Sequence, residues 1–181
     1  MYEKESVHDA LARFCCCKPG GWYSGNAQGN PKLSDAEVAS VAVVANQIDI
    51  SYAEIAKKRS QDADVLKFAQ TMIDDHTAVI SQAASLAKKL GVVPKDNDVS
   101  RQLLADAEKT KKELQSKSGE AFNTAYVDNE VAYHKAVIGA VEGLLIPETE
   151  NAELKSLLQK VLPALKAHLG HAEMLQKNRK K

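Results

Sequence analysis

The sequence predicts an all-α protein, a bundle of four long helices with a long helical crossover between the second and the third. Three observations predict this fold. The 181 residues include only 9 glycines and 5 prolines, too few for the many turns of most all-β proteins. From residue 34 onward, apolar residues recur every three or four positions, the period of a helix with one buried face. The connections between these stretches are short, then long, then short, and this order sets the topology.

The first two long helices are predicted to form an antiparallel hairpin. Ser34 with Glu37 three residues later forms a capping box, which marks the start of the first helix. The turn falls at residues 60–62, and Gly91 ends the second helix. The inward positions are Val38, Val41, Ala45, Ile48, Tyr52 and Ile55 on the first helix, and Val65, Ala69, Met72, His76, Val79, Ala83, Leu86 and Leu90 on the second.

The second half of the chain contains a shorter, charge-rich helix at about residues 98–116 and then two more long helices, 122–145 and 151–178. Pro147 is predicted to close the third long helix, and Pro163 to bend the fourth, because proline removes a backbone hydrogen bond. The inward positions are Val127, Val131, His134, Ile138, Val141 and Leu145, followed by Leu154, Leu158, Val161, Leu165, His168, Ala172 and Leu175.

The connection at residues 91–118 decides how the two hairpins are joined. A tight turn does not need so many residues, whereas a return along the bundle does, and a helix of about 18 residues would cover roughly 27 Å of it. The second and third long helices should therefore run parallel. One crossover between two hairpins is the ferritin-like arrangement, and the domain is predicted over residues 34–178.

Residues 1–33 are predicted to be a flexible N-terminal extension, because their glycines and prolines exclude a long helix. Arg13 interrupts the only apolar run there, so no signal peptide is expected. Cys15, Cys16 and Cys17 are adjacent, which suits neither a disulfide framework nor a zinc site. A thiol-rich tail for metal or lipid attachment is the alternative interpretation of this segment.

Charge and hydropathy exclude two classes of partner. Lys plus Arg and Asp plus Glu number 24 each, and a nucleic-acid-binding protein normally has a basic excess. No apolar stretch is long enough for a transmembrane helix. The sequence leaves open whether the chain forms homo-oligomers.

Histidines occupy three inward positions where the helical period calls for apolar residues. Counting residues from each turn places His76 level with His134, and Asp49, Glu130 and His168 about one turn away. Two layers of imidazole and carboxylate inside a bundle suit a metal or dimetal site, so the candidate ligands are Asp49, His76, Glu130, His134 and His168. Divalent iron, manganese, zinc and copper are the candidate metals. Asp75 and Asp128 flank the same region.

A second interpretation treats the same residues as a buried hydrogen-bond network that fixes helix register without a cofactor. The Glu-x-x-His pattern of diiron bundles is not met, since Ile73 and Val131 stand three residues before His76 and His134. No phosphate-binding loop, nucleophile elbow or H-E-x-x-H motif occurs. The sequence therefore indicates either a metal-binding bundle or a structural and interaction module, and it assigns no catalytic residue.

Three motifs resemble those of a bacterial ferritin-like family known as domain of unknown function 4142: Phe68-Ala69-Gln70-Thr71-Met72 with Asp75-His76-Thr77, Phe122 and Tyr126 before His134, and Leu162-Pro163 before His168-Leu169. The resemblance covers about residues 34–178. Asp49 stands where that family usually has Glu, which keeps a carboxylate. The resemblance implies a ferritin-like fold and a periplasmic location, since members are mostly predicted to be exported to the periplasm. Members are often labelled outer-membrane proteins, and the resemblance implies no reaction.

Overall fold

The computed structural model describes residues 31–179, and within this range the chain is helical with no strand. The predicted all-α class is therefore confirmed. Most of the predicted extension, including Cys15, Cys16 and Cys17, lies outside the described residues. In chain order the elements are α2 (Asp35–Arg59), α3 (Ala63–Leu90), α4 (Asp98–Gln115), α5 (Gly119–Ala140), the π-helical turn η1 (Val141–Leu145), α6 (Ile146–Glu148) and α7 (Ala152–Arg179).

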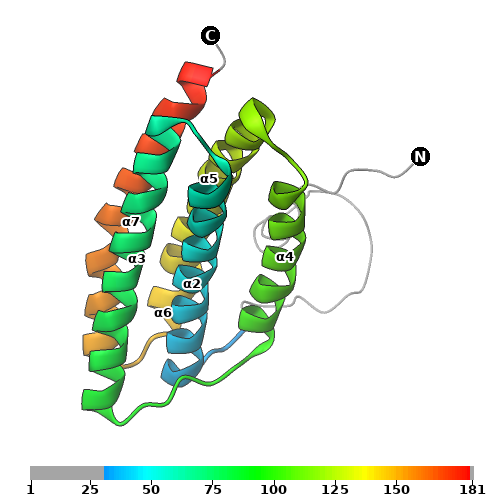
Figure 1. Ribbon diagram of the computed structural model, residues 1–181. Helices are drawn as coiled ribbons and strands as arrows, with labels where there is room; N and C mark the ends of the chain where they lie inside the picture. The colour runs from blue at the N-terminus through cyan, green and yellow to red at the C-terminus, as the bar shows by residue number, and fades with distance from the viewer. Residues whose placement is uncertain (1–30, 180–181) are drawn as a thin grey trace, which may run out of the picture.

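The four long helices α2, α3, α5 and α7 lie side by side in a bundle. Figure 1 shows α2 and α7 running one way along it and α3 and α5 the other way. The second and third long helices are thus parallel, as the length of the connection between them predicts. The most extensive contacts are those of α2 with α3 and of α5 with α7, while α3 also meets α7 and α2 also meets α5.

The crossover helix α4 returns along the outside of this bundle, against α2 and α5 (Figure 1). It buries Ala107 and Leu114 on its inner face, and its outer face carries ion pairs such as that of Lys109 with Asp106 at 2.8 Å. Asn97 caps α4 by accepting a hydrogen bond from the backbone N–H of Ser100. The amide of Asn97 also donates to the carbonyl of Glu37, which ties the start of the crossover to the start of α2.

Local sequence signals set the helix ends. The carboxylate of Glu37 accepts hydrogen bonds from the backbone N–H and the hydroxyl of Ser34, so the predicted capping box is formed. Asp62 accepts from two backbone N–H groups in the first turn of α3. Gly91 ends α3 in the left-handed region at φ 65°, a conformation that is costly for residues with a Cβ atom.

Two boundaries differ from the prediction. Pro147 does not close the third long helix, which continues through η1 and α6 to Glu148. In η1 the N–H of Ile146 donates to the carbonyl of Val141, five residues back, so the turn just before Pro147 is wider than that of a regular helix. The second boundary is the start of the domain. Leu33 is buried and its N–H donates to Glu148 Oε2 at 3.4 Å, so packing begins before residue 34.

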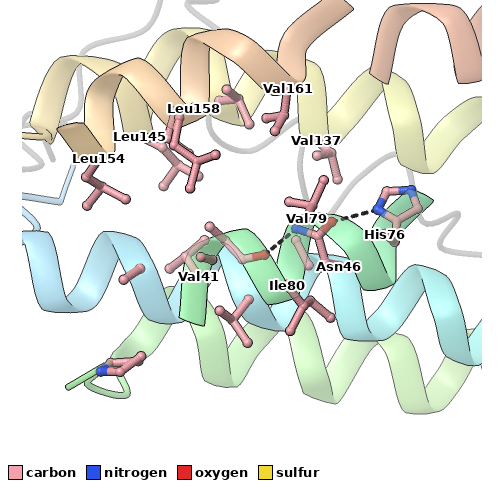
Figure 2. A pocket seen from close by; sticks show the side chains of 18 of the residues that line it. Val41, Asn46, His76, Val79, Ile80, Val137, Leu145, Leu154, Leu158 and Val161 are labelled. Carbon is pink, nitrogen blue, oxygen red and sulfur yellow. Dashed lines mark hydrogen bonds between the residues drawn. The ribbon is translucent and has the colours of Figure 1, made fainter. Parts of the chain in front are cut away.

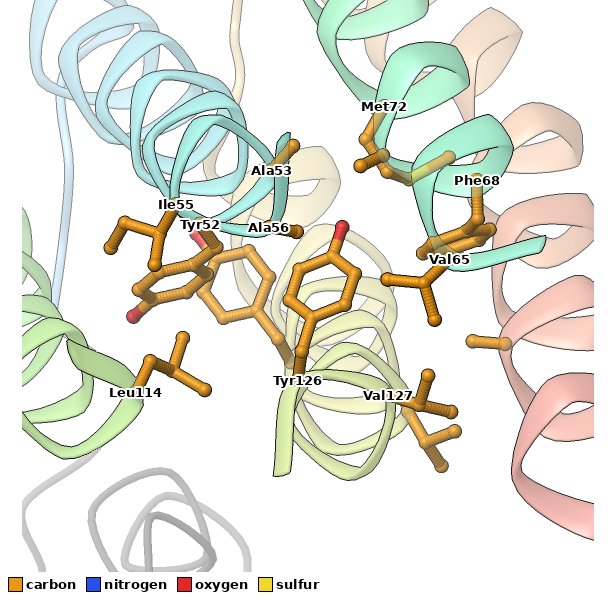
Figure 3. Close-up of a cluster of buried hydrophobic side chains, with 14 of the residues drawn as sticks. Tyr52, Ala53, Ile55, Ala56, Val65, Phe68, Met72, Leu114, Tyr126 and Val127 are labelled. Atoms are coloured by element: carbon orange, nitrogen blue, oxygen red, sulfur yellow. The ribbon is translucent and has the colours of Figure 1, made fainter. Parts of the chain in front are cut away.

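The core has two apolar clusters, one toward each end of the bundle. Figure 3 shows the cluster near the 60–62 turn, where Phe68 and Tyr126 from facing helices meet edge-on with ring centroids 6.3 Å apart. Phe122 stacks on Tyr126 at 6.2 Å. Burying each such ring stabilises the fold by about 1.5–3 kcal/mol. The second cluster joins Val38, Val41, Ile138, Leu145, Leu154, Leu158 and Leu165.

Among residues 31–179, no helix combines the length and the apolar character that a membrane span requires.

Candidate metal centre

Between the two apolar clusters, three histidine side chains from three helices come together. His76 of α3, His134 of α5 and His168 of α7 are buried, with exposed fractions of 4%, 1% and 7%. Their ring centroids lie 5.3 to 5.8 Å apart. We call these residues the histidine cluster. One nitrogen from each lies within 4.8 Å of the others, close enough for all three to bind one ion.

Two carboxylates lie directly against this cluster. Asp49 Oδ2 is 3.4 Å from His76 Nε2 and 3.6 Å from His134 Nε2. Glu130 Oε2 is 3.5 Å from His134 Nδ1. Asp49 and Glu130, the carboxylate pair, have no solvent exposure. Together with His134 they form a second set whose ligand atoms lie within 4.8 Å of one another.

The structure therefore brings all five residues singled out by the sequence into one region, but their levels differ from the prediction in one respect. His168 lies with His76 and His134, and not one turn away beside Glu130. The reason is the turn between α5 and α7. Since α6 ends at Glu148 and α7 starts at Ala152, the hairpin turns later in the chain than the position near 148 that was expected.

Each histidine uses one ring nitrogen in a hydrogen bond that fixes its tautomer. Asn46 donates through Nδ2 to the carbonyl of Ala42, so its Oδ1 accepts from His76 Nδ1 at 2.7 Å. His134 Nδ1 donates to the carbonyl of Glu130 at 3.0 Å. Each bond places the proton on Nδ1, and His76 Nε2 and His134 Nε2, left with lone pairs, have no hydrogen-bond partner.

His168 follows the same logic with its two nitrogens exchanged. Its Nε2 donates to Asp75 Oδ2 at 2.9 Å, and its Nδ1 has no partner. All three histidines thus have one oriented nitrogen and one free lone pair. Metal-binding histidines in proteins show this arrangement, with the second nitrogen bonded to a carboxylate, a carbonyl or an amide.

Sequence reasoning missed two of these supporting side chains as partners. Counting residues from the first turn places Asn46 level with His76, and this register could have identified Asn46 as its partner. The sequence places Asp75 beside the candidate ligands, and in the structure Asp75 binds His168 from the partly exposed edge of the site. Asp128, flagged in the same way, faces the surface and accepts from Gln176 Nε2 at 2.8 Å.

Burial shifts the pKa values of four side chains in the site. It raises the pKa of Asp49, and burial together with the nearby Asp49 charge raises the pKa of Glu130 well above its ordinary range. Burial, with smaller contributions from neighbouring histidines, lowers the pKa of His76 to about 3 and that of His134 to about 4. The imidazoles of His76 and His134 are therefore neutral at physiological pH, the form that binds metals.

The carboxylate pair is poorly satisfied without a cation. None of its four oxygens has a hydrogen bond of ordinary geometry, and neither has the hydroxyl of Tyr126, although it lies near enough to Glu130 to favour the charged carboxylate. A buried polar group without a partner costs about 1–3 kcal/mol. Such atoms converging at one point are the chemical setting that a divalent cation would stabilise.

The site departs from the diiron pattern in the way the sequence indicates. Ile73 and Val131, in place of the two glutamates of that pattern, pack against or within the apolar core. The remaining donors are three imidazoles and two carboxylates, and no thiolate lies among them. This set fits one metal ion with mixed nitrogen and oxygen ligands.

The chain was compared with family models, with curated proteins and with solved structures. A family model described as a domain of unknown function, DUF4142, matches residues 23–175. A search of curated proteins finds no match to the chain. A search of solved structures also finds none.

Proposed function

The chain belongs to the DUF4142 family, a family defined without a function, and from its buried site we propose that it is a ferritin-like bundle protein that binds a divalent transition metal in its core. The metal would lie among the histidine cluster and the carboxylate pair. Two hairpins joined by one crossover helix support the ferritin-like assignment, because that topology is shared by bundles with metal sites between facing helices.

One observation carries this proposal. Each histidine of the cluster keeps one nitrogen free while the other donates to a fixed acceptor. A network serving packing alone would be expected to satisfy both nitrogens, because buried polar atoms are almost always paired. Three free lone pairs beside two carboxylates are better explained by an absent cation than by a network complete in itself.

Charge supports the same conclusion. Burial raises the pKa values of Asp49 and Glu130, and no lysine or arginine is among the groups that shift them. Once ionised, the pair would carry two negative charges without a cationic partner. A divalent ion neutralises both, and neutral imidazoles then complete its coordination without adding charge. Imidazole and carboxylate together suit iron, manganese, zinc and copper. The role that fits such a site is the handling of metal or of oxidative stress.

The decisive experiment is titration calorimetry of tag-free, chelator-treated protein with divalent iron (under anaerobic conditions), manganese, zinc and copper. We expect at least one metal to bind far more tightly than millimolar. His134→Leu should abolish binding, because His134 belongs to both ligand sets. His171→Leu is the matched control, because it makes the same substitution at a histidine that belongs to neither ligand set. His171 lies on α7 and packs against Phe68.

Affinity no tighter than about millimolar for all four metals would reject the proposal. The buried network without a cofactor would then be the better interpretation. Equal losses in His134→Leu and His171→Leu would also contradict the assigned site, since a general loss of structure and not of ligands would explain them.

A further inference from the structure

An apolar cavity adjoins the histidine cluster. It has a volume of about 440 Å³ and is lined by side chains from all four long helices. Figure 2 shows Val79 and Ile80 of α3, Val137 of α5 and Leu158 and Val161 of α7 bordering this space, with His76 at one end and Leu154 at the other. The cavity is about three times the size of the engineered cavity of roughly 150 Å³ that admits benzene.

The seam of α3 shows that this space is a feature of the fold. In the first half of the helix, Val65, Ala69 and Met72 are fully buried. In the second half, Val79 and Leu86 continue the same seam but are only partly buried, because they face the cavity and not packed side chains. A seam that stays apolar without being filled is suited to an apolar ligand.

The π-helical turn η1 lies on the same space, since Val141 and Leu145, its first and last residues, both line it. A π turn costs hydrogen-bond geometry relative to a regular helix and is frequent at functional sites. Here it belongs to the wall of the cavity.

The shape of the cavity limits what can enter. Its lining on α7 runs from Leu154 to His168, fourteen residue steps, or about 21 Å of helix. The volume of about 440 Å³ is spread along this length, so the space is long and narrow. A single unbranched chain fits such a space lengthwise, whereas a folded peptide segment does not.

Polarity differs between the two ends. Asn46, Asp49 and the histidine cluster border one end, and the walls leading away from them are almost wholly apolar. Leu90, Val93 and Pro94 border the other end, and Val93 is 81% exposed, so this end lies at the surface. A ligand that enters from the surface here would place its far end against the candidate metal centre.

We propose that this cavity binds an unbranched alkyl chain with one oxygen-bearing head group, and that the head group lies at the metal. The position of the head group rests on the proposed metal-binding function, whereas the apolar part does not. In metal-free protein the end of the cavity at the histidine cluster offers a buried carboxylate no cationic partner, so an alcohol should bind better than a fatty acid. With metal bound, a fatty-acid carboxylate gains a cation to ligate and should bind more tightly.

The test uses the full chain and two probes, 1-decanol and decanoate, whose binding is measured directly by titration calorimetry. In metal-free protein we expect 1-decanol to bind and decanoate to bind at least tenfold more weakly. Added metal should strengthen decanoate at least tenfold and leave 1-decanol within about threefold.

Variants locate the binding. Ala83→Phe places a ring in the cavity and should weaken 1-decanol at least tenfold while raising the melting temperature of the ligand-free protein. Ala83→Leu gives a smaller intrusion, in case the larger side chain prevents folding. Ala78→Phe is the matched control, because Ala78 is exposed on α3 and does not line the cavity.

No binding of 1-decanol to folded, metal-free protein would overturn the proposal, and so would equal binding by Ala83→Phe and Ala78→Phe. Metal that binds without changing decanoate affinity would overturn the placement of the head group. If no metal binds, the proposed function fails, and the 1-decanol result still decides the cavity on its own.

Discussion

Replacing Glu130 with leucine should make the metal-free protein more stable and the metal-bound protein less stable than wild type. The carboxylate of Glu130 has no exposure and neither of its oxygens has a hydrogen-bond partner. Leucine has a similar volume, so the change opens little cavity and removes the penalty of an unpaired buried group. We therefore expect Glu130→Leu to gain about 1–3 kcal/mol in unfolding free energy without metal.

With metal the order should reverse. Wild-type protein at a metal concentration one thousand times its Kd gains about 4.1 kcal/mol of stability, more than the advantage of Glu130→Leu without metal, because the ion binds only the folded state. Glu130→Leu lacks one ligand and should lose most of this gain. Urea unfolding followed by circular dichroism, with chelator in one series and metal in the other, measures both quantities.

The control and the refuting result are equally definite. Glu54→Leu makes the same substitution at an exposed position of α2 and should change stability by less than about 0.5 kcal/mol in either series. If Glu130→Leu instead destabilises the chelated protein by more than 1 kcal/mol, the carboxylate is satisfied without a cation. The reasoning from its unpaired oxygens would then be refuted.

Three further outcomes are expected from residues outside the ligand set. Ser34 and Lys95 hold the pKa of Glu37 down at about 2 against an ordinary 4.5, so Glu37 adds stability that is present above pH 4.5 and lost as pH falls through 2; Glu37→Gln should remove that dependence from acid-unfolding curves. Tyr133→Phe should cost about 1 kcal/mol in urea unfolding, because the hydroxyl donates to the carbonyl of Ala45. Phe68→Ala should cost about 3–5 kcal/mol and lower the melting temperature, and a cost below 1 kcal/mol would mean that the aromatic cluster is not a packed core.

The helices and their directions could be predicted because local signals agreed with long-range ones. The Ser34–Glu37 pair and Gly91 mark ends that the structure confirms. The register of the first hairpin was also predictable, since its turn has only residues 60–62 between helices. Counting back from that turn pairs His76 with Asn46, and the two side chains are hydrogen-bonded.

The register of the second hairpin could not be predicted in the same way. A turn centred at 148 pairs His134 with Leu162, whereas helix ends at Glu148 and Ala152 move the centre to 150 and the partner to Lys166. Lys166 is within two residues of His168, so His134 and His168 lie at nearly the same level. Interpreting Pro147 as a stop conceals the later turn, because the helix continues past it to Glu148.

The apolar cavity was invisible to sequence reasoning for a different reason. Helical periodicity reports which face of α3 points inward and says nothing of whether neighbouring helices fill the space before it. Val79 and Leu86 have the same period as Val65 and Met72, and yet one pair borders the cavity and the other a packed core. Packing of this kind depends on side-chain volumes from four helices at once.

The candidate ligands are divided between the two hairpins, and this division affects the order in which the site forms during folding. Asp49 and His76 belong to the first hairpin, and Glu130, His134 and His168 to the second. Contacts within each hairpin are local in the chain and can form early, whereas the ligand set is complete only when the hairpins dock. An ion held by residues of both hairpins stabilises the docked state relative to the separated hairpins. Bound metal should therefore lower the frequency with which the two hairpins separate in the folded protein.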